Sequence, residues 1–148
     1  MFMYEALLRR AKNQSPIRVG LIGAGKFGSM FLAQVPSTPG LEVMAIADLF
    51  PDQAKATCAS IGWSKELIAQ TIFSQDAVEI MQSVELDVIV EAIGDPIAGI
   101  THARHAIANR RHIVMVNVEA DVLAGSFLAQ EAEEAGVFIR WPMAISLR

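Results

Sequence analysis

Three closely spaced glycines follow the first apolar run of the chain. Gly23, Gly25 and Gly28 stand directly after Ile17–Ile22 and open a segment with a helical apolar period. In that setting the first glycine allows a tight turn, the second lets the backbone approach a pyrophosphate, and the third lets the helix pack closely on a sheet. A helix N-terminus also carries about half a positive charge. The spacing therefore predicts a dinucleotide cradle, with ordinary turn chemistry as the alternative. Its predicted cofactor-binding residues are Gly23, Gly25, Lys26, Phe27 and Gly28.

An aspartate, Asp48, ends the second predicted strand, 20 residues after Gly28. At this place in a dinucleotide site an acid accepts hydrogen bonds from the adenine ribose. Such a charge-assisted hydrogen bond contributes about 1.5–3 kcal/mol, whereas a 2′-phosphate about 4 Å away would be repelled by roughly 1–4 kcal/mol. Asp48 therefore favours NAD over NADP, while Lys26 and the loop after Asp48 leave room for a phosphate. Capping of the helix that begins near Pro51 is the structural alternative.

Two further residues are expected at the crevice because each follows a later predicted strand. Gly94, in the stretch Glu91–Pro96, would let the nicotinamide half of a cofactor pass close to the backbone. The alternative for this stretch is a plain turn. Asn117 follows the fifth strand, where its amide could bind the carboxamide or the substrate. Both residues are predicted to bind cofactor.

Other chemistry-bearing side chains point less clearly to a site. Glu119 and Asp121, two residues apart, could hold a divalent cation or act as acid and base. The alternative is capping and favourable charge at a helix start. His102 and His105 share one helix face without a third metal ligand. We predict no metal site and assign no catalytic residue.

The elements that position these residues alternate along the chain. Six short runs are apolar on both faces, as in a parallel sheet covered on both sides: Ile17–Ile22, Glu42–Ala47, Thr71–Phe73, Asp87–Ala92, His112–Val116 and Val137–Ile139. Helical patterns lie between them at Lys26–Val35, Pro51–Ile61, Gln75–Gln82, Ile97–Asn109 and Val122–Ala135. This order predicts an α/β fold with a doubly wound parallel sheet, a Rossmann-type NAD(P)-binding domain over residues 17–139. Residues 1–16 are expected to form an N-terminal docking helix.

Composition excludes several classes of protein. The 148 residues carry a formal net charge of −4, which disfavours nucleic acid as a partner. Apolar runs of about six residues are too short to cross a membrane, and no secretion signal opens the chain. The single cysteine, Cys58, lies in an apolar helical pattern and is expected in the core. A cytoplasmic location is predicted.

The stretches Ile17–Phe31, Val90–Pro96 and Val114–Gly125 are similar to the amino-terminal part of homoserine-dehydrogenase-like oxidoreductases. That group includes the 1-deoxy-D-xylulose 5-phosphate reductoisomerase-like enzymes. The resemblance implies a nicotinamide-dependent oxidoreductase whose second domain supplies most of the substrate site. Reductoisomerases use NADPH, so the cofactor expected here is NAD(P). Homoserine dehydrogenases carry Asn-Lys where this chain has Asn117-Val118, which speaks against homoserine as the substrate.

Residues 140–148 depart from the expected pattern, because Trp141 and Pro142 interrupt an apolar strand. Their codons, read in another frame, give a continuation similar to that of the family, so a frameshift that truncates the protein is one hypothesis. The predicted function is the NAD(P)-binding part of an oxidoreductase that transfers hydride to or from a small hydroxy or carbonyl substrate. The alternative is a catalytically silent nucleotide-binding module or truncated remnant. Self-association into a homo-oligomer and, less favoured, an S-adenosyl or nucleoside ligand are further expectations.

Overall fold

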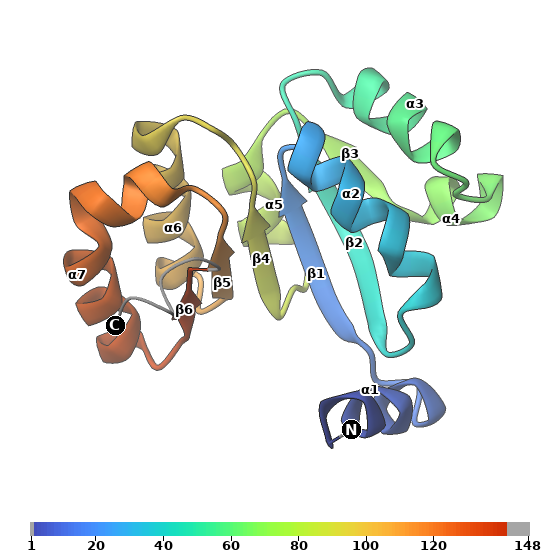
Figure 1. Cartoon of the computed structure of the whole chain (residues 1–148), viewed down its shortest axis with the longest axis horizontal. Helices are drawn as coiled ribbons and strands as arrows, with labels where there is room; N and C mark the ends of the chain where they lie inside the picture. Colours follow the sequence, from blue (N-terminus) through green and yellow to red (C-terminus); the bar gives the residue numbers. More distant parts are fainter. Residues whose placement is uncertain (1, 142–148) are drawn as a thin grey trace.

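The computed structural model describes residues 2–141, at whose centre lies a sheet of six strands. They are β1 (Ile17–Ile22), β2 (Leu41–Ala47), β3 (Ile72–Ser74), β4 (Val88–Glu91), β5 (His112–Met115) and β6 (Ile139–Arg140). Their order is β3-β2-β1-β4-β5-β6, and every neighbouring pair is parallel (Figure 1). The chain reverses its direction of winding between β1 and β4, where open α/β sheets bind ligands. The predicted doubly wound, Rossmann-type fold is confirmed.

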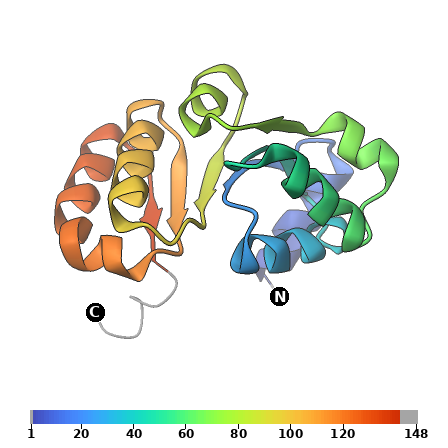
Figure 2. The ribbon, with the colours of Figure 1, turned by 90° about the horizontal axis from the view of Figure 1, so that it is seen from above.

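Helices cover both faces of this sheet (Figure 2). On one face lie α2 (Lys26–Gln34), which continues into the short 3-10 turn η1 (Val35–Ser37), then α3 (Pro51–Ser60) and α4 (Lys65–Gln70). The other face carries α5 (Ala77–Ser83), α6 (Pro96–Ala108) and α7 (Val118–Ala135). Adjacent residues of β1 point into different layers, since Leu21 packs in the first layer and Ile22 in the second. Burial on both sides explains why the central strands are largely apolar.

Helix α1 (Phe2–Lys12) precedes the sheet and lies within residues 1–16. It lies beside the end of the sheet at which β1 and β2 begin (Figure 1). None of its side chains is buried. The backbone of α1 lies close to the backbone at Gly40, because a Cβ at Gly40 would overlap the carbonyl oxygen of Leu7. Gly40 also has a φ of 80°, which favours glycine.

Most element bounds differ from the predicted ones by one or two residues, and side-chain caps explain the larger differences among the helices. Ser64 caps α4, a short helix that was not predicted, by accepting a hydrogen bond from the Leu67 amide. Asp76 caps α5, whereas Ser74 ends β3. Helix α7 begins at Val118 rather than at Val122, because Asn117 caps it. A polar side chain that accepts from the first-turn amides fixes where a helix starts.

The end of the described chain lies within the fold. Strand β6 runs to Arg140, and Trp141 is only 6% exposed in the hydrophobic core. These two residues of the predicted aberrant tail therefore pack with the sheet. Residues 142–148, on which the rest of that prediction and the frameshift hypothesis depend, lie outside the described residues. Among residues 2–141, no helix combines the length and apolar character needed to cross a membrane.

Cys58 is fully buried in the layer formed by α2, α3 and α4. Burial raises the pKa of its thiol to about 11, because the thiolate would lose its hydration. The nucleophilic form is therefore scarce at neutral pH. The expectation that Cys58 is a core residue is confirmed.

An ion pair joins β1 to the segment that leads into β4. The Arg18 guanidinium donates to both carboxylate oxygens of Asp87, at 3.2 and 3.1 Å, and the Arg18 backbone N–H donates to the same carboxylate at 2.9 Å. Glu85 lies 2.9 Å from the guanidinium. The hydrogen bonds from the Arg18 side chain lower the pKa of Asp87. This contact stabilises the crossing between the two halves of the sheet.

We expect Asp87→Asn to lower the free energy of unfolding at pH 7. Because the folded-state pKa of Asp87 is depressed, its carboxylate contributes stability above its unfolded pKa of about 3.9. That contribution is lost as the pH falls through the folded-state value. Urea unfolding as a function of pH should therefore show the wild type and Asp87→Asn converging as the pH falls below the unfolded pKa of about 3.9. A difference that persists unchanged into acid would contradict the assignment.

Candidate functional site

The glycine loop begins where β1 ends, at the point of reversal in the sheet. Gly23 has a φ of 93°, in the left-handed region that favours glycine. Its N–H donates to the Ala47 carbonyl at 2.8 Å. A Cβ at Gly23 would lie 3.1 Å from the carbonyl atoms of Ala92 and from the Ile93 side chain. The turn after β1 therefore packs tightly against the loop that follows β4.

Gly25 caps α2 without a side chain and faces open space. Apart from Gly25 itself and its two chain neighbours, no atom lies within 4 Å of the position that its Cβ would take. Lys26 and Phe27 beside it are exposed. The Ser29 amide is the first to donate within the helix, to the Gly25 carbonyl at 2.8 Å. The preceding amides of the first turn have no intrahelical acceptor. This accessible helix N-terminus can bind an anion through backbone N–H groups.

Gly28 is buried and holds α2 against the start of its own loop. A Cβ there would overlap the carbonyl oxygen of Gly23, a backbone atom. The glycine thus permits a close approach between helix and turn, as the spacing predicted.

Asp48 connects the loops that follow β1 and β2. Its Oδ2 accepts from the Ala24 amide and its Oδ1 from the Phe50 amide, both at 2.9 Å. The first of these contacts has no signal in the sequence. A carboxylate offers about four lone-pair sites, so two remain for hydroxyl donors. Asp48 therefore lies beside the glycine loop and retains acceptor capacity.

The loops after β4 and β5 are tied together by Asn117. Gly94 is exposed, with no atom within 4 Å of its Cβ position. Asn117 is only 4% exposed. Its Oδ1 accepts from the Ala120 amide at 3.0 Å, and its Nδ2 donates to the carbonyls of Ile93 at 3.1 Å and Asp95 at 2.8 Å. Asn117 thus holds the loop that contains Gly94, and its contact with a cofactor stays a prediction.

The remaining candidate groups form no metal centre within residues 2–141. Glu119 and Asp121 belong to the first turn of α7, where negative charge is favourable. Within residues 2–141, no group of three or more His, Cys, Asp or Glu side chains could hold a metal ion. His102 faces the buried Glu91, whereas His105 lines a groove between α6 and α7.

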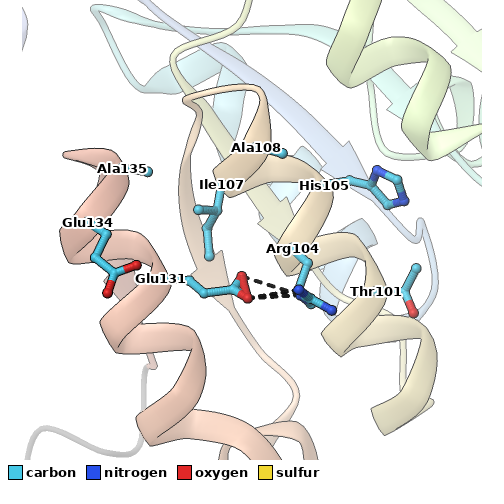
Figure 3. Close-up of a pocket in the computed structure, with 8 residues that line it drawn as sticks. All are labelled: Thr101, Arg104, His105, Ile107, Ala108, Glu131, Glu134 and Ala135. Carbon is cyan, nitrogen blue, oxygen red and sulfur yellow. Dashed lines mark hydrogen bonds and ion pairs between the residues drawn. The ribbon is translucent and has the colours of Figure 1, made fainter.

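That groove is the hollow shown in Figure 3, with a volume of about 570 Å³. Arg104 crosses it to Glu131, at 3.0 Å between Nη2 and Oε1. None of its lining residues belongs to the glycine loop or to the loops after β2 and β4. It is a surface feature of the last helix pair, separate from the candidate site.

The strand order and the glycine loop at the reversal of the sheet define a dinucleotide-binding domain. Residues 17–120 match the family model GFO_IDH_MocA, described as an oxidoreductase family with an NAD-binding Rossmann fold. The chain therefore belongs to this oxidoreductase family. The expected membership of a nicotinamide-dependent oxidoreductase family is confirmed. A comparison with curated proteins found no match.

Solved structures with the same fold include two homoserine dehydrogenases. The enzyme from Thiobacillus denitrificans is 23% identical with a TM-score of 0.72, covering 85% of this chain and 29% of that one. The S. aureus enzyme is 21% identical with a TM-score of 0.65, covering 85% and 32%. A candidate oxidoreductase from Bacillus subtilis is 19% identical with a TM-score of 0.69, covering 84% and 33%. The chain thus spans about a third of the length of these structures.

Proposed function

We propose that the chain binds a nicotinamide dinucleotide along the carboxyl edge of its sheet, as the cofactor-binding part of an oxidoreductase. One observation carries this proposal. Helix α2 begins at Lys26, its N-cap Gly25 offers no side-chain cap, and beyond the two neighbouring residues no atom lies within 4 Å of the Gly25 Cβ position. Backbone N–H groups of a helix start can bind phosphate there. The open space and the donors fit a pyrophosphate.

The proposal assigns a part of the dinucleotide to each loop. The pyrophosphate lies over Gly23 and Gly25, with Lys26 available to a phosphate oxygen and Phe27 beside it. Asp48 accepts from the adenine ribose. Gly94 allows the nicotinamide half to pass close to the backbone, and Asn117 supports that loop. When bound, the nicotinamide ring supplies or accepts the hydride, and the substrate is a small hydroxy or carbonyl compound.

NAD is the preferred form on electrostatic grounds. The Asp48 carboxylate stabilises a ribose hydroxyl donor and repels a 2′-phosphate at the same place, by roughly 1–4 kcal/mol at about 4 Å. Both Asp48 oxygens already accept from backbone amides, which holds the carboxylate in position. Its charge therefore stays directed at the ribose site.

Titration of NADH and NADPH against the chain, followed by nicotinamide fluorescence, tests both claims. The wild type is expected to bind NADH more tightly. Asp48→Asn is expected to raise the affinity for NADPH relative to NADH by about tenfold or more, because it removes the repulsion. Glu42→Gln, which removes one exposed charge from β2, the strand that precedes Asp48, should leave the ratio unchanged. Tighter NADPH binding by the wild type would reject the NAD preference, and no binding of either would reject the proposal.

A binding-only module is the second candidate, favoured by the state of Asn117. Both of its amide hydrogens are donated to loop carbonyls, so it is not free to engage a substrate. Incubation of the chain with NADH and a panel of small aldehydes, ketones and 2-oxo acids separates the two candidates. Oxidation of NADH supports an enzyme, whereas binding without oxidation supports a binding-only module. The predicted cytoplasmic location and homo-oligomer remain predictions.

A further inference from the structure

A carboxylate lies in the core directly beneath the loop that follows β4. Glu91, the last residue of β4, has 0% exposure. Its Oε1 accepts from the Ile93 amide at 2.9 Å. Its Oε2 has no hydrogen-bond partner among residues 2–141, and the same holds for Nδ1 of His102. These two side chains approach to 3.8 Å, between His102 Nδ1 and Glu91 Oε1.

Helix α6 leaves room for this polar cluster through a glycine. A Cβ at Gly99 would lie 2.9 Å from Nδ2 of Asn117 and 3.1 Å from Oε2 of Glu91. Glycine in a helix interior is unfavourable relative to alanine. Here the missing side chain lets α6 pass closely over two buried polar groups that come from β4 and from the cap of α7.

Glu91 and Asn117 together fix the loop from Ala92 to Asp95. Glu91 accepts the Ile93 amide, while Asn117 donates to the carbonyls of Ile93 and Asp95. The same loop packs on the glycine turn, since the Cβ position of Gly23 is 3.1 Å from Ala92. A change in this loop is therefore transmitted to the glycine loop, beside which the proposed function places the dinucleotide.

Stability alone does not account for a carboxylate at this position. An apolar residue would avoid the cost of desolvating a charged or polar group in the core. Because Glu91 is fully buried, it also does not reach a ligand itself. What the carboxylate provides is a hydrogen bond that sets the path of the backbone where the strand ends.

We propose that Glu91 and Asn117 are positioning residues, which shape the Ala92–Asp95 loop to receive the nicotinamide half of the cofactor. This inference rests on the proposed dinucleotide binding. The inference concerns only the nicotinamide half of the site, because the proposed phosphate and adenosine contacts belong to the loops after β1 and β2. Loss of Glu91 therefore impairs one half and spares the other.

The test compares NADH with ADP, a probe that lacks the nicotinamide and its ribose, by calorimetry on the full chain. Glu91→Leu is expected to weaken NADH binding about tenfold and to leave ADP binding unchanged. Glu91→Gln is expected to bind NADH within about threefold of the wild type. Its amide oxygen can still accept from the Ile93 amide, as Oε1 of Glu91 does.

Asn117→Asp provides a second variant should Glu91→Leu not fold. It keeps the acceptor that caps α7 but loses both donors to the loop, so NADH binding alone should weaken. Ile107→Ala is the control for general destabilisation, because it creates a cavity on the buried face of α6 away from the loop. It should change neither the NADH affinity nor the ADP affinity. Faster hydrogen exchange of the Ile93 amide in Glu91→Leu would show the loosened loop directly.

The outcomes are distinguishable. Equal weakening of NADH and ADP in Glu91→Leu, or no weakening of either, overturns the positioning role while leaving the proposed function intact. Wild-type protein that binds neither NADH nor ADP overturns the proposed function, and the positioning role with it.

Discussion

Gly25→Val is expected to abolish dinucleotide binding while leaving the fold intact. The valine side chain would project into the open space over the start of α2, where no protein atom lies within 4 Å. Gly25 has a φ of −75°, so a side chain there brings no left-handed strain. A pyrophosphate and an isopropyl group exclude each other from that space. We expect the affinity for NADH and NADPH to fall by at least about a hundredfold, which is about 2.7 kcal/mol.

Calorimetry with NADH and NADPH measures the affinity of Gly25→Val, and urea unfolding of the same protein measures its stability. The unfolding midpoint of Gly25→Val should stay close to that of the wild type. Ala33→Val is the matched control, because it adds a β-branched residue to an exposed position later in α2. It should bind both coenzymes normally. Wild-type affinity in Gly25→Val would mean that the dinucleotide does not lie over α2.

The strands and the glycine loop were predictable because their causes are local. The run Ile17–Ile22 is apolar apart from Arg18 near its start, since helices cover both faces of β1, and it has the bounds of the observed strand. The glycine spacing likewise reflects requirements within a single turn. Helix α4 was missed because six residues are too few to establish a period. Its only sequence signal is Ser64, which stands where an N-cap belongs.

Residues whose roles depend on distant neighbours were predicted incompletely. Asn117 was expected at the crevice on the strength of its place after β5, but its cap on α7 and its donors to the Ile93 and Asp95 carbonyls required the fold. Glu91 gave no signal of its own. Its burial depends on Gly99 of α6, and nothing in the spacing of the two residues indicates that they meet.

Gly28→Ala tests the other requirement of the loop, the close approach of α2 to the turn. In a helix interior, alanine is more favourable than glycine by about 1 kcal/mol, so helix propensity alone predicts that Gly28→Ala is stabilising. The structure predicts the opposite, because the added methyl group would overlap the Gly23 carbonyl oxygen. That oxygen belongs to a turn packed against Ala92, so the turn has little room to move. We expect Gly28→Ala to lower the free energy of unfolding by about 3 kcal/mol, as overpacking against backbone does.

Urea unfolding of Gly28→Ala and Gly25→Ala distinguishes the effect of the steric overlap from the effect of adding a methyl group, because both variants add one methyl group to the same loop. Only Gly28→Ala should be destabilised, since the Cβ position of Gly25 is open. Displacement of α2 also moves the first-turn amides, so Gly28→Ala should lose NADH affinity together with stability, whereas Gly25→Val loses affinity alone. An unfolding midpoint of Gly28→Ala at or above that of the wild type would show that the helix and the turn are free to separate, and that Gly28 does not hold the cradle in shape.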